Sequence, residues 1–276
     1  MDLQSTIRLN NGVEIPQQAL GVFKVENDRC AECVRWALEA GYRHIDTAAV
    51  YGNERGVGQG IRDSGVNRQD IFLTTKLWND DMRKGRVREA FEESLEKLGT
   101  SYVDLYLIHW PVPGVFEKCW AEMETLYRQG RVRAIGVSNF HQYHMEALLK
   151  SARIIPAVNQ IELHPLLTQK PLSAYCRALG IEIEAYRPLG GTGEHNLVNN
   201  PDIAAVAAHY GRSGAQVLLR WSLQHGNIVL AKSTHQDRIV QNADIYDFEI
   251  SAADMAQLDS LNRDFHTGSN PDTFDF

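Results

Sequence analysis

Short apolar segments alternate with longer stretches of helical periodicity through most of the chain. The short segments have the length and composition of buried β-strands, and the stretches between them repeat apolar positions as covering helices do. This alternation predicts a parallel sheet whose strands are connected by helices. The predicted strands are residues 19–22, 44–46, 71–76, 103–109, 132–138, 157–161, 182–186 and 228–230.

Eight such strands predict closure of the sheet, so the expected fold is α/β, a (β/α)8 TIM barrel that forms a single domain over residues 1–276. Residues 6–16, TIRLNNGVEIP, predict a β-hairpin before the barrel. After the last strand, a helix is predicted within HQDRIVQNADIYDF. An extra C-terminal helix follows, with Ser251 as its N-cap and Asp254 three residues on. Residues 263–276 predict a loop-like tail, because they are rich in Gly, Asn, Asp and Pro.

Glycines mark the ends of predicted helices and also bear on a rival fold. REAFEESLEKLG ends in Gly99, and the stretches NPDIAAVAAHYG and SGAQVLLRWSLQHG end in the same way. A doubly wound open sheet is the structural rival, but it usually carries G-x-G-x-x-G after its first strand. Gly56, Gly58 and Gly60 are instead two residues apart in a helix-like stretch. A dinucleotide would therefore have to bind by another route.

Four polar residues stand at or just beyond the ends of predicted strands: Asp46, Tyr51, Lys76 and His109. Taken singly, each has an ordinary structural explanation, such as a helix cap or a surface lysine. However, Lys76 and His109 end the apolar strands FLTTK and LYLIH, where an unpartnered polar group would be costly to bury. A barrel of parallel strands gathers such ends over one pocket, so the four residues predict a catalytic site.

The charge balance excludes some classes of partner. The chain has 276 residues, with 28 Lys+Arg against 35 Asp+Glu and a formal net charge of -7. This balance argues against a surface for nucleic acid or an anionic membrane. The N-terminal residues lack the pattern of a signal peptide, and no apolar run reaches bilayer length. The sequence therefore predicts a cytoplasmic protein.

Neither the cysteines nor the histidines predict a metal site. Cys30 and Cys33 form a CxxC motif, but it lies in the helical stretch DRCAECVRWALEAG with no second ligand pair. We expect two helix cysteines rather than a redox pair. His141 and His144 are the only close histidine pair near the predicted rim, and no third ligand lies near them in sequence. No bound metal is expected.

Several long motifs occur in an order that resembles the aldo-keto reductase family. They are GYRHIDTAAVYGNE, DIFLTTKLWN, YVDLYLIHWP, VRAIGVSNF, VNQIELHP and the run KSTHQDRIVQN. The resemblance covers nearly the whole chain. Within the family the sequence looks most like the short microbial and protozoan members, the 2,5-diketo-D-gluconate reductases and the trypanosomatid-type prostaglandin F synthases.

The resemblance implies a role for each of the four polar residues. Tyr51 is the expected proton donor to a substrate carbonyl, Asp46 pairs with Lys76, and His109 orients the carbonyl oxygen. Lys76 is expected to lower the pKa of Tyr51, since a nearby ammonium favours the phenolate. A neutral His109 could donate an N–H toward the oxygen as negative charge develops there.

The resemblance also implies NADPH as the cofactor, since no side chain can supply a hydride. Ser138, Asn139 and Gln160 match residues that bind the carboxamide, and Tyr186 matches the aromatic residue that stacks on the nicotinamide ring. The segment at the adenosine end carries two cations and two hydroxyls near a helix start, which favours a 2′-phosphate. The remaining cofactor-binding residues expected from the resemblance are Arg187, Leu189, Lys232, Ser233, Thr234, Arg238, Gln241 and Asn242.

Two departures from the family pattern concern the cofactor. Arg187 stands where relatives usually carry a small hydroxyl residue that helps to hold the pyrophosphate, and Ala231 replaces a common proline before Lys232. Either change could loosen the cofactor loop, although Arg187 could instead contact a phosphate directly. Tighter binding of NADPH than of NADH is still expected.

The expected partner is a small carbonyl compound in an open pocket. Phe23, Trp78 and Trp110 match family positions that line the substrate pocket with His109, and both WPVPGVF and the tail are short. Small aldehydes, α-keto esters, diketo acids and quinones all fit this expectation. The main alternative function is a regulatory barrel that senses the nicotinamide cofactor, and a third is an isomerase or lyase. The barrel needs no partner for its core, so a monomer is expected.

Overall fold

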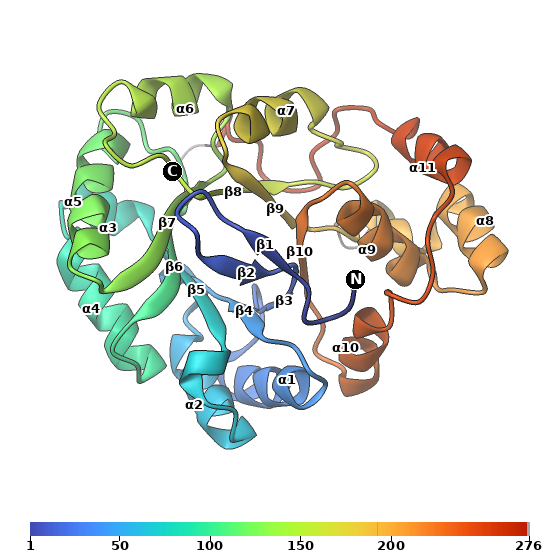
Figure 1. The fold of residues 1–276 in the computed structure, drawn as a ribbon, viewed down its shortest axis with the longest axis horizontal. Helices are drawn as coiled ribbons and strands as arrows, with labels where there is room; N and C mark the ends of the chain where they lie inside the picture. The colour runs from blue at the N-terminus through green and yellow to red at the C-terminus, as the bar shows by residue number, and fades with distance from the viewer. Residues whose placement is uncertain (192, 275–276) are drawn as a thin grey trace.

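A closed barrel of parallel strands forms the centre of the protein in a computed structural model that describes residues 1–191 and 193–274 (Figure 1). The order around the barrel is β10-β3-β4-β5-β6-β7-β8-β9, so each strand pairs with its neighbour in sequence and the last pairs with the first. The TIM-barrel prediction is confirmed. The barrel strands are β3 (Gln18–Gly21), β4 (His44–Asp46), β5 (Phe72–Leu77), β6 (Val103–Ile108), β7 (Val132–Ser138), β8 (Val158–Glu162), β9 (Glu182–Tyr186) and β10 (Ile228–Ala231).

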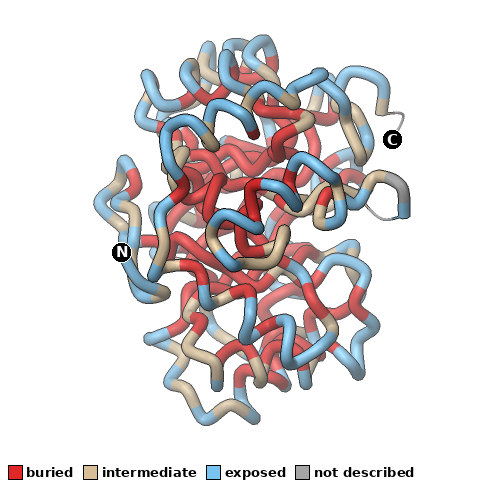
Figure 2. The backbone as a smooth tube through the Cα atoms, turned by 90° about the vertical axis from the view of Figure 1, so that its right-hand side faces the viewer, coloured by how far each residue is buried: buried red, intermediate tan, exposed pale blue. Residues whose placement is uncertain are grey.

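Helices cover the outside of the barrel, and Figure 2 shows the buried backbone inside them and the exposed turns around it. Gly99 and Gly211 adopt the left-handed conformation that ends α4 and α8, as their positions predicted. The helices are α1 (Asn27–Glu39), α2 (Glu54–Ser64), α3 (Asn79–Arg83), α4 (Val87–Leu98), α5 (Phe116–Arg128), α6 (Gln142–Leu149), α7 (Lys170–Ala178), α8 (Pro201–Tyr210), α9 (Gly214–Gln224), α10 (Gln236–Ala243) and α11 (Ala252–Asp259). Short 3-10 turns are η1 (Ala49–Tyr51), η2 (Arg68–Asp70), η3 (Gly193–His195) and η4 (Leu197–Asn199).

The predicted hairpin closes one end of the barrel. Strands β1 (Thr6–Arg8) and β2 (Glu14–Pro16) pair antiparallel, and β2 leads almost directly into β3. Leu9 and Ile15 are buried from this hairpin against apolar residues inside the barrel, among them Phe72 and Leu105. Because the hairpin fills the end where the strands begin, the carboxyl ends of the strands are left for a functional site.

The three glycines of α2 have a packing explanation. A Cβ on Gly56 would lie 2.1 Å from the Asn27 carbonyl oxygen in α1, and one on Gly58 would lie 2.3 Å from the Leu98 carbonyl oxygen in α4. A Cβ on Gly60 would lie 2.5 Å from the Ala31 carbonyl oxygen, also in α1. The glycines therefore allow α2 to pack against two neighbouring helices, and they form no phosphate-binding loop.

The C-terminal segment returns to the end of the barrel where the strands finish. Ser251 caps α11 by accepting a hydrogen bond from the Asp254 backbone N–H at 3.1 Å, as predicted. Beyond α11, the backbone N–H groups of Arg263 and Phe265 both donate to the Leu166 carbonyl oxygen. We use the name tail for residues 263–274.

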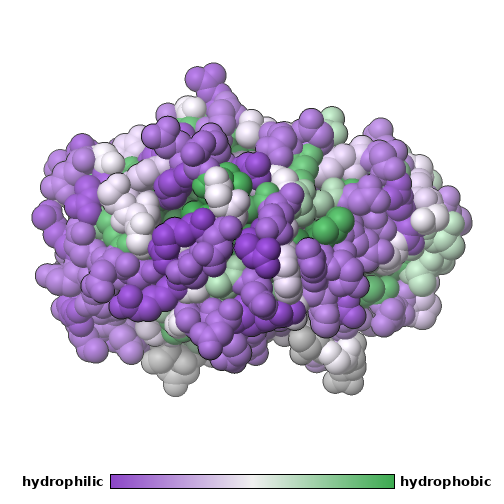
Figure 3. Space-filling model, turned by 90° about the horizontal axis from the view of Figure 1, so that it is seen from below, coloured by the Kyte–Doolittle hydropathy of each residue, from purple (hydrophilic) through white to green (hydrophobic). Residues whose placement is uncertain are grey.

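The surface is mainly polar on the face that Figure 3 displays, where hydrophobic side chains appear in separate patches among hydrophilic ones. Among residues 1–191 and 193–274, none of the helices has the length and apolar character needed to cross a bilayer.

Candidate active site

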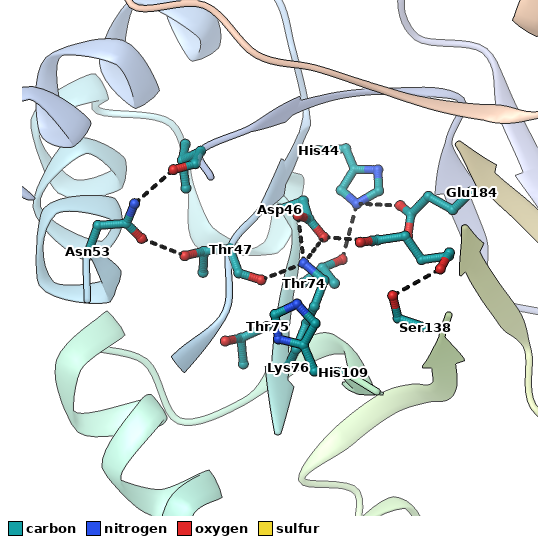
Figure 4. Close-up of polar contacts among 12 residues, drawn as sticks. His44, Asp46, Thr47, Asn53, Thr74, Thr75, Lys76, His109, Ser138 and Glu184 are labelled. Atoms are coloured by element: carbon teal, nitrogen blue, oxygen red, sulfur yellow. Dashed lines mark hydrogen bonds and ion pairs between the residues drawn. The ribbon is translucent and has the colours of Figure 1, made fainter. Parts of the chain in front are cut away.

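The side chains of Asp46, Lys76 and His109 lie together at the carboxyl ends of adjacent strands (Figure 4). The Lys76 ammonium donates to both oxygens of Asp46, at 2.7 and 2.8 Å, and to the Thr47 carbonyl oxygen at 2.8 Å. Lys76 is fully buried, so these three acceptors compensate for the loss of water. The expected pairing of Asp46 with Lys76 is therefore present.

Tyr51 joins this group from the short turn η1 that follows β4. Its ring centroid lies 5.2 Å from the Lys76 Nζ and 5.6 Å from the His109 ring centroid. The positions of the four residues at strand ends predicted that they would meet, and they do lie close together in space.

Asn53 holds the turn that carries Tyr51. The Asn53 side chain accepts a hydrogen bond from the Thr47 hydroxyl at 2.8 Å and donates to the carbonyl oxygens of Val22 and Val25 at 2.9 Å each (Figure 4). Asn53 is fully buried. This brace joins the β3 and β4 loops, so it fixes the position from which the Tyr51 ring reaches the pocket.

Lys76 was expected to lower the pKa of Tyr51, but the net shift of that pKa in this arrangement is upward. Burial, and then the charge of Asp46, raise the pKa of the Tyr51 phenol well above its ordinary value of 10.0. The Lys76 ammonium directs its N–H groups to Asp46 and Thr47, so the adjacent carboxylate balances its charge. Tyr51 therefore holds its proton at neutral pH and can donate it to a strongly basic oxygen such as a forming alkoxide.

His109 is a neutral imidazole in this site. Burial and the nearby Lys76 charge lower the pKa of His109 well below its ordinary value of 6.5. Its Nδ1 is buried and has no hydrogen-bond partner within the described part of the chain. A neutral ring carries one N–H, so His109 can donate to an oxygen in the pocket without supplying a positive charge.

Aromatic side chains surround Tyr51 and His109. The Phe23 ring lies 5.0 Å from the Tyr51 ring, and the Trp78 ring lies 5.2 Å from the His109 ring. Trp110 lies on the other side of His109 at 6.5 Å. The tail adds an aromatic residue that the sequence analysis missed, since Phe274 stacks on Trp110 with ring centroids 4.4 Å apart.

The residues expected at the carboxamide form one connected group. The Tyr186 hydroxyl donates to Asn139 Oδ1 at 2.7 Å, and the Asn139 amide donates to the His109 carbonyl oxygen and the Ser138 hydroxyl. The Ser138 hydroxyl donates to the Gln160 carbonyl oxygen at 2.9 Å (Figure 4). Asn139 has a positive φ of 64°, an uncommon conformation that Asn tolerates better than most residues.

The residues expected at the adenosine end lie in the turn after β10 and in α10 itself. Lys232 and Arg238 are exposed, and the Ser233 hydroxyl accepts a hydrogen bond from the His235 backbone N–H at 3.1 Å. Arg29 in α1 donates to the Thr234 carbonyl oxygen at 2.8 Å, a support that the sequence analysis did not anticipate. Of the other two residues, Gln241 is exposed, whereas Asn242 is buried and accepts from Gln18 through its backbone carbonyl.

Arg187 and Leu189 lie where the chain leaves β9. Arg187 has a positive φ of 52° and donates through its guanidinium to the Thr267 carbonyl oxygen at 2.9 Å. Leu189 is half buried, and its backbone carbonyl accepts from Leu197. The departure from the family pattern at Arg187 therefore joins the barrel to the tail.

Glu162, the last residue of β8, is the main anchor of the tail. Its carboxylate accepts hydrogen bonds from the backbone N–H groups of Thr267 and Gly268, from the Thr267 hydroxyl, and from the rings of His164 and His266. Burial alone would raise the pKa of Glu162, but the hydrogen bonds from the two histidines and Thr267 outweigh it and lower the pKa. A charged carboxylate thus fixes the tail at the rim of the barrel.

Glu184, in the middle of β9, is a second buried carboxyl group that the sequence analysis missed. It is fully buried beside Gln160, Asp46 and His44 (Figure 4). One sequence signal could have found it. In a strand, alternate residues share a face, so Glu184 points to the same side as Tyr186, which had been assigned to the pocket.

The chain is similar over almost its whole length to known reductases. The chain is 51% identical over 271 residues to glyoxal reductase of Bacillus subtilis, covering 98% of this chain and 97% of that relative. It is 47% identical over 269 residues to the 9,11-endoperoxide prostaglandin H2 reductase of Trypanosoma cruzi, covering 97% and 95%. The crystal structure of a Bombyx mori aldo-keto reductase in complex with NADP matches with a TM-score of 0.92 and 38% identity, covering 99% and 97%.

A TIM barrel with a buried, protonated tyrosine, a buried Lys–Asp pair and a neutral histidine at its carboxyl end has the groups that carbonyl reduction requires. The sequence pattern described as "Aldo/keto reductase family" matches residues 19–263. The chain belongs to the aldo/keto reductase family. It is a carbonyl-reducing oxidoreductase that uses a nicotinamide cofactor, and none of the reported relatives supports the alternative of a regulatory barrel.

Proposed function

We propose that this enzyme reduces small aldehydes and ketones to alcohols, with NADPH as the hydride donor and Tyr51 as the proton donor. The observation that carries the proposal is the fully buried Lys76–Asp46 pair beside Tyr51 and the neutral His109. A buried ion pair often gives no more stability than apolar side chains of similar volume, so its presence here favours a functional role.

The residues present fit a nicotinamide cofactor, which supplies a hydride when bound. Both N–H groups of the Gln160 side chain are donated to carboxyl oxygens of Asp46 and Glu184, so its own oxygen is the atom that would accept a carboxamide N–H. Ser138 and Asn139 would hold the other side of the carboxamide, and the half-buried Tyr186 ring would stack on the nicotinamide. Its hydroxyl bond to Asn139 keeps this ring in place.

The segment before α10 supports NADPH rather than NADH. Lys232 and Arg238 place two exposed cations at the start of α10, and the N-cap His235 makes no side-chain capping hydrogen bond there. Free backbone N–H groups at a helix start favour an anion, and two cations favour a group with more than one negative charge. A 2′-phosphate has that charge, whereas the adenosine ribose of NADH has an uncharged hydroxyl at the same position.

The side chains of the site donate the proton and bind the carbonyl oxygen of the substrate. A substrate carbonyl oxygen placed between Tyr51 and His109 would accept an N–H from His109, which polarises the C=O bond. As the carbon gains a hydride, the oxygen becomes basic and takes the Tyr51 proton, which gives the alcohol and a phenolate. The Lys76 ammonium, 5.2 Å from the ring centroid, stabilises that phenolate until solvent returns the proton.

The pocket favours small or flat carbonyl compounds. The rings of Phe23, Trp78 and Trp110 lie around Tyr51 and His109, and Phe23 is 44% exposed. Glyoxal and related dicarbonyls are the first candidates, since a relative at 51% identity is a glyoxal reductase. Other aldehydes, α-keto esters, diketo acids and quinones belong in the same panel.

A spectrophotometric assay tests the proposal. The protein is mixed with NADPH and each carbonyl compound, and absorbance near 340 nm is followed. We expect consumption of NADPH with at least one small aldehyde or dicarbonyl, and slower consumption with NADH. Tight NADPH binding without turnover of any compound would support a cofactor sensor instead, and conversion of a substrate without loss of NADPH would support an isomerase or lyase.

Monomeric state and cytoplasmic location stay predictions from the sequence. Size-exclusion chromatography with light scattering tests the first. A particle mass near 31.1 kDa, the mass of one chain, is expected.

A further inference from the structure

Glu184 is a buried acid in the centre of the barrel to which the proposed mechanism gives no task. It lies on β9, is fully buried, and faces residues of β4 and β8 (Figure 4). Its Oε2 accepts a hydrogen bond from Gln160 Nε2 at 2.7 Å, while Asp46 Oδ2 accepts from the same nitrogen at 2.9 Å. The Gln160 amide thus bridges two carboxyl groups.

This bridge determines which way the Gln160 amide points. A side-chain amide has two N–H donors on its nitrogen and only acceptor lone pairs on its oxygen. If the amide were turned over, the Gln160 oxygen would face two carboxyl oxygens, which are acceptors like itself. Asp46 and Glu184 together therefore hold the nitrogen toward the barrel interior and leave the oxygen for another donor.

His44 indicates the protonation state of Glu184. His44 Nδ1 lies 3.2 Å from the Pro16 carbonyl oxygen, which only accepts, so this nitrogen carries the hydrogen. Burial is the main cause that lowers the pKa of His44 to about 3, so Nε2 has a lone pair. That lone pair faces the Thr74 hydroxyl at 3.1 Å and Glu184 Oε1 at 3.6 Å.

A proton on Glu184 Oε1 removes the repulsion between a charged carboxylate oxygen and the lone pair of His44 Nε2. Oε1 is buried and has no hydrogen-bond partner in the described part of the chain, and as a carboxylate oxygen it would face a lone pair of His44. Burial and the Asp46 charge also raise the pKa of Glu184 above its ordinary value of 4.5. The titratable groups around it are His44, Asp46, Lys76 and Tyr51, and β10 contributes only apolar residues.

We propose that Glu184 is a positioning residue that acts as a neutral acid and, with Asp46, fixes the Gln160 amide so that its oxygen meets the N–H of the nicotinamide carboxamide. This inference rests on the proposed function, in which Gln160 binds the carboxamide. Because the acid is neutral, it positions Gln160 without adding a second negative charge beside the single cation Lys76. The same amide links the carboxamide site directly to the Lys76–Asp46 pair.

Binding of two cofactors tests the proposal. NADP+ has a carboxamide with two N–H groups, whereas its 3-acetylpyridine analogue has a methyl ketone with none. Dissociation constants for both are measured by fluorescence quenching with the wild type, Glu184→Leu, Glu184→Gln and Gln160→Leu. Thermal unfolding of each variant is recorded alongside, and Glu184→Met replaces the leucine variant if that chain does not fold.

We expect the wild type to prefer NADP+ over the analogue by about tenfold, the scale of one well-placed hydrogen bond in a buried site. Glu184→Leu should lose most of this preference while it keeps its melting temperature, because apolar replacement of a buried acid often leaves stability unchanged. Glu184→Gln keeps an acceptor for Gln160 and should restore the preference. A residue with only a packing role would change the melting temperature and leave the preference alone.

Two results would overturn the proposal in distinguishable ways. If Gln160→Leu abolishes the preference but Glu184→Leu retains it, Glu184 does not position the amide. If Gln160→Leu itself retains the wild-type preference, Gln160 does not bind the carboxamide, and that part of the proposed function fails together with the inference.

Discussion

Lys76 and Asp46 show why single buried residues decide the chemistry here. Lys76 is fully buried and its ammonium contacts both Asp46 oxygens, so each charge is stable only because the other is present. The pair lies under the Tyr51 ring, where it balances the phenolate that proton donation would leave. The same pair therefore contributes to stability and to catalysis, and variants can separate the two contributions.

Lys76→Met should lower both stability and activity. It leaves Asp46 as an uncompensated buried charge, and we expect a loss of about 3–5 kcal/mol in the free energy of unfolding. The reduction rate should fall by at least about a hundredfold, the scale of general acid catalysis. The double variant Asp46→Asn/Lys76→Met should regain most of the stability in urea unfolding and none of the activity. Recovery of activity in the double variant would show that the cation has no catalytic role.

The strand-end residues could be predicted from sequence, because the energetic cost of burying an unpartnered polar side chain can be recognised from the apolar strand that precedes it. A lysine or histidine that ends an apolar strand must find a partner, and the barrel topology says where that partner lies. The protonation of Tyr51 could not be predicted in the same way. It depends mainly on the burial of the phenol inside the closed barrel and then on the Asp46 charge. Tertiary packing determines this burial, and no local pattern in the sequence contains it.

At the scale of elements, the turn before α10 and its first residues form the candidate site for the adenosine phosphate. Lys232 and Arg238 are exposed there, and Arg29 of α1 supports the turn through the Thr234 carbonyl oxygen. This hydrogen bond from a neighbouring helix restrains the turn that follows Ala231. The position of α1 relative to this turn follows from tertiary packing, which the sequence pattern does not contain.

Removal of the two cations should change the choice of cofactor. In Lys232→Ala/Arg238→Ala we expect the dissociation constant for NADPH to rise by about tenfold or more, because charge-assisted hydrogen bonds to the 2′-phosphate are lost. The constant for NADH should stay nearly unchanged. Arg131→Ala, which removes an exposed cation paired with Glu92, is the matched control. Equal weakening of both cofactors, measured by fluorescence quenching, would contradict the assignment.

Element boundaries were predicted to within one residue for the barrel strands, because turns and apolar runs mark them clearly. The remaining errors have a tertiary cause. The strand expected to end at Lys76 continues to Leu77, since Leu77 pairs with Ile108 in the neighbouring strand. The short helix α3 was missed, because its sequence NDDMR lacks apolar periodicity.

At the scale of the whole molecule, the tail joins strands β8 and β9 at the rim of the pocket. Glu162 of β8 binds Thr267 and Gly268, and Arg187 after β9 binds the Thr267 carbonyl oxygen. Phe274 then stacks on Trp110, which follows β6. The composition of residues 263–276 predicted a loop. The contacts that hold this loop are hydrogen bonds to residues far away in sequence. No local pattern in the sequence predicts such bonds.

Glu162→Gln should weaken the tail in a pH-dependent manner. Because the pKa of Glu162 is lowered in the folded protein, its stabilisation is present above the ordinary carboxyl value of 4.5 and is lost as the pH falls below that value. We expect the variant to be less stable by about 1–3 kcal/mol at pH 7, as for a buried acceptor that is lost. The difference should shrink as the pH falls below 4.5. Urea unfolding at pH 7 and at a pH below 4.5 measures the stability difference between variant and wild type. The exposed Glu89→Gln is the control. A difference that grows on acidification would contradict the proposed anchor.

The central claim is that Tyr51 donates the proton, and Tyr51→Phe tests it most directly, because only the hydroxyl is removed. The measurement pairs the rate of NADPH consumption with the best aldehyde substrate and the dissociation constant for NADPH in the same variant. The account predicts a rate at least about a hundredfold below that of the wild type, with NADPH binding unchanged. Near-normal turnover in Tyr51→Phe would contradict it.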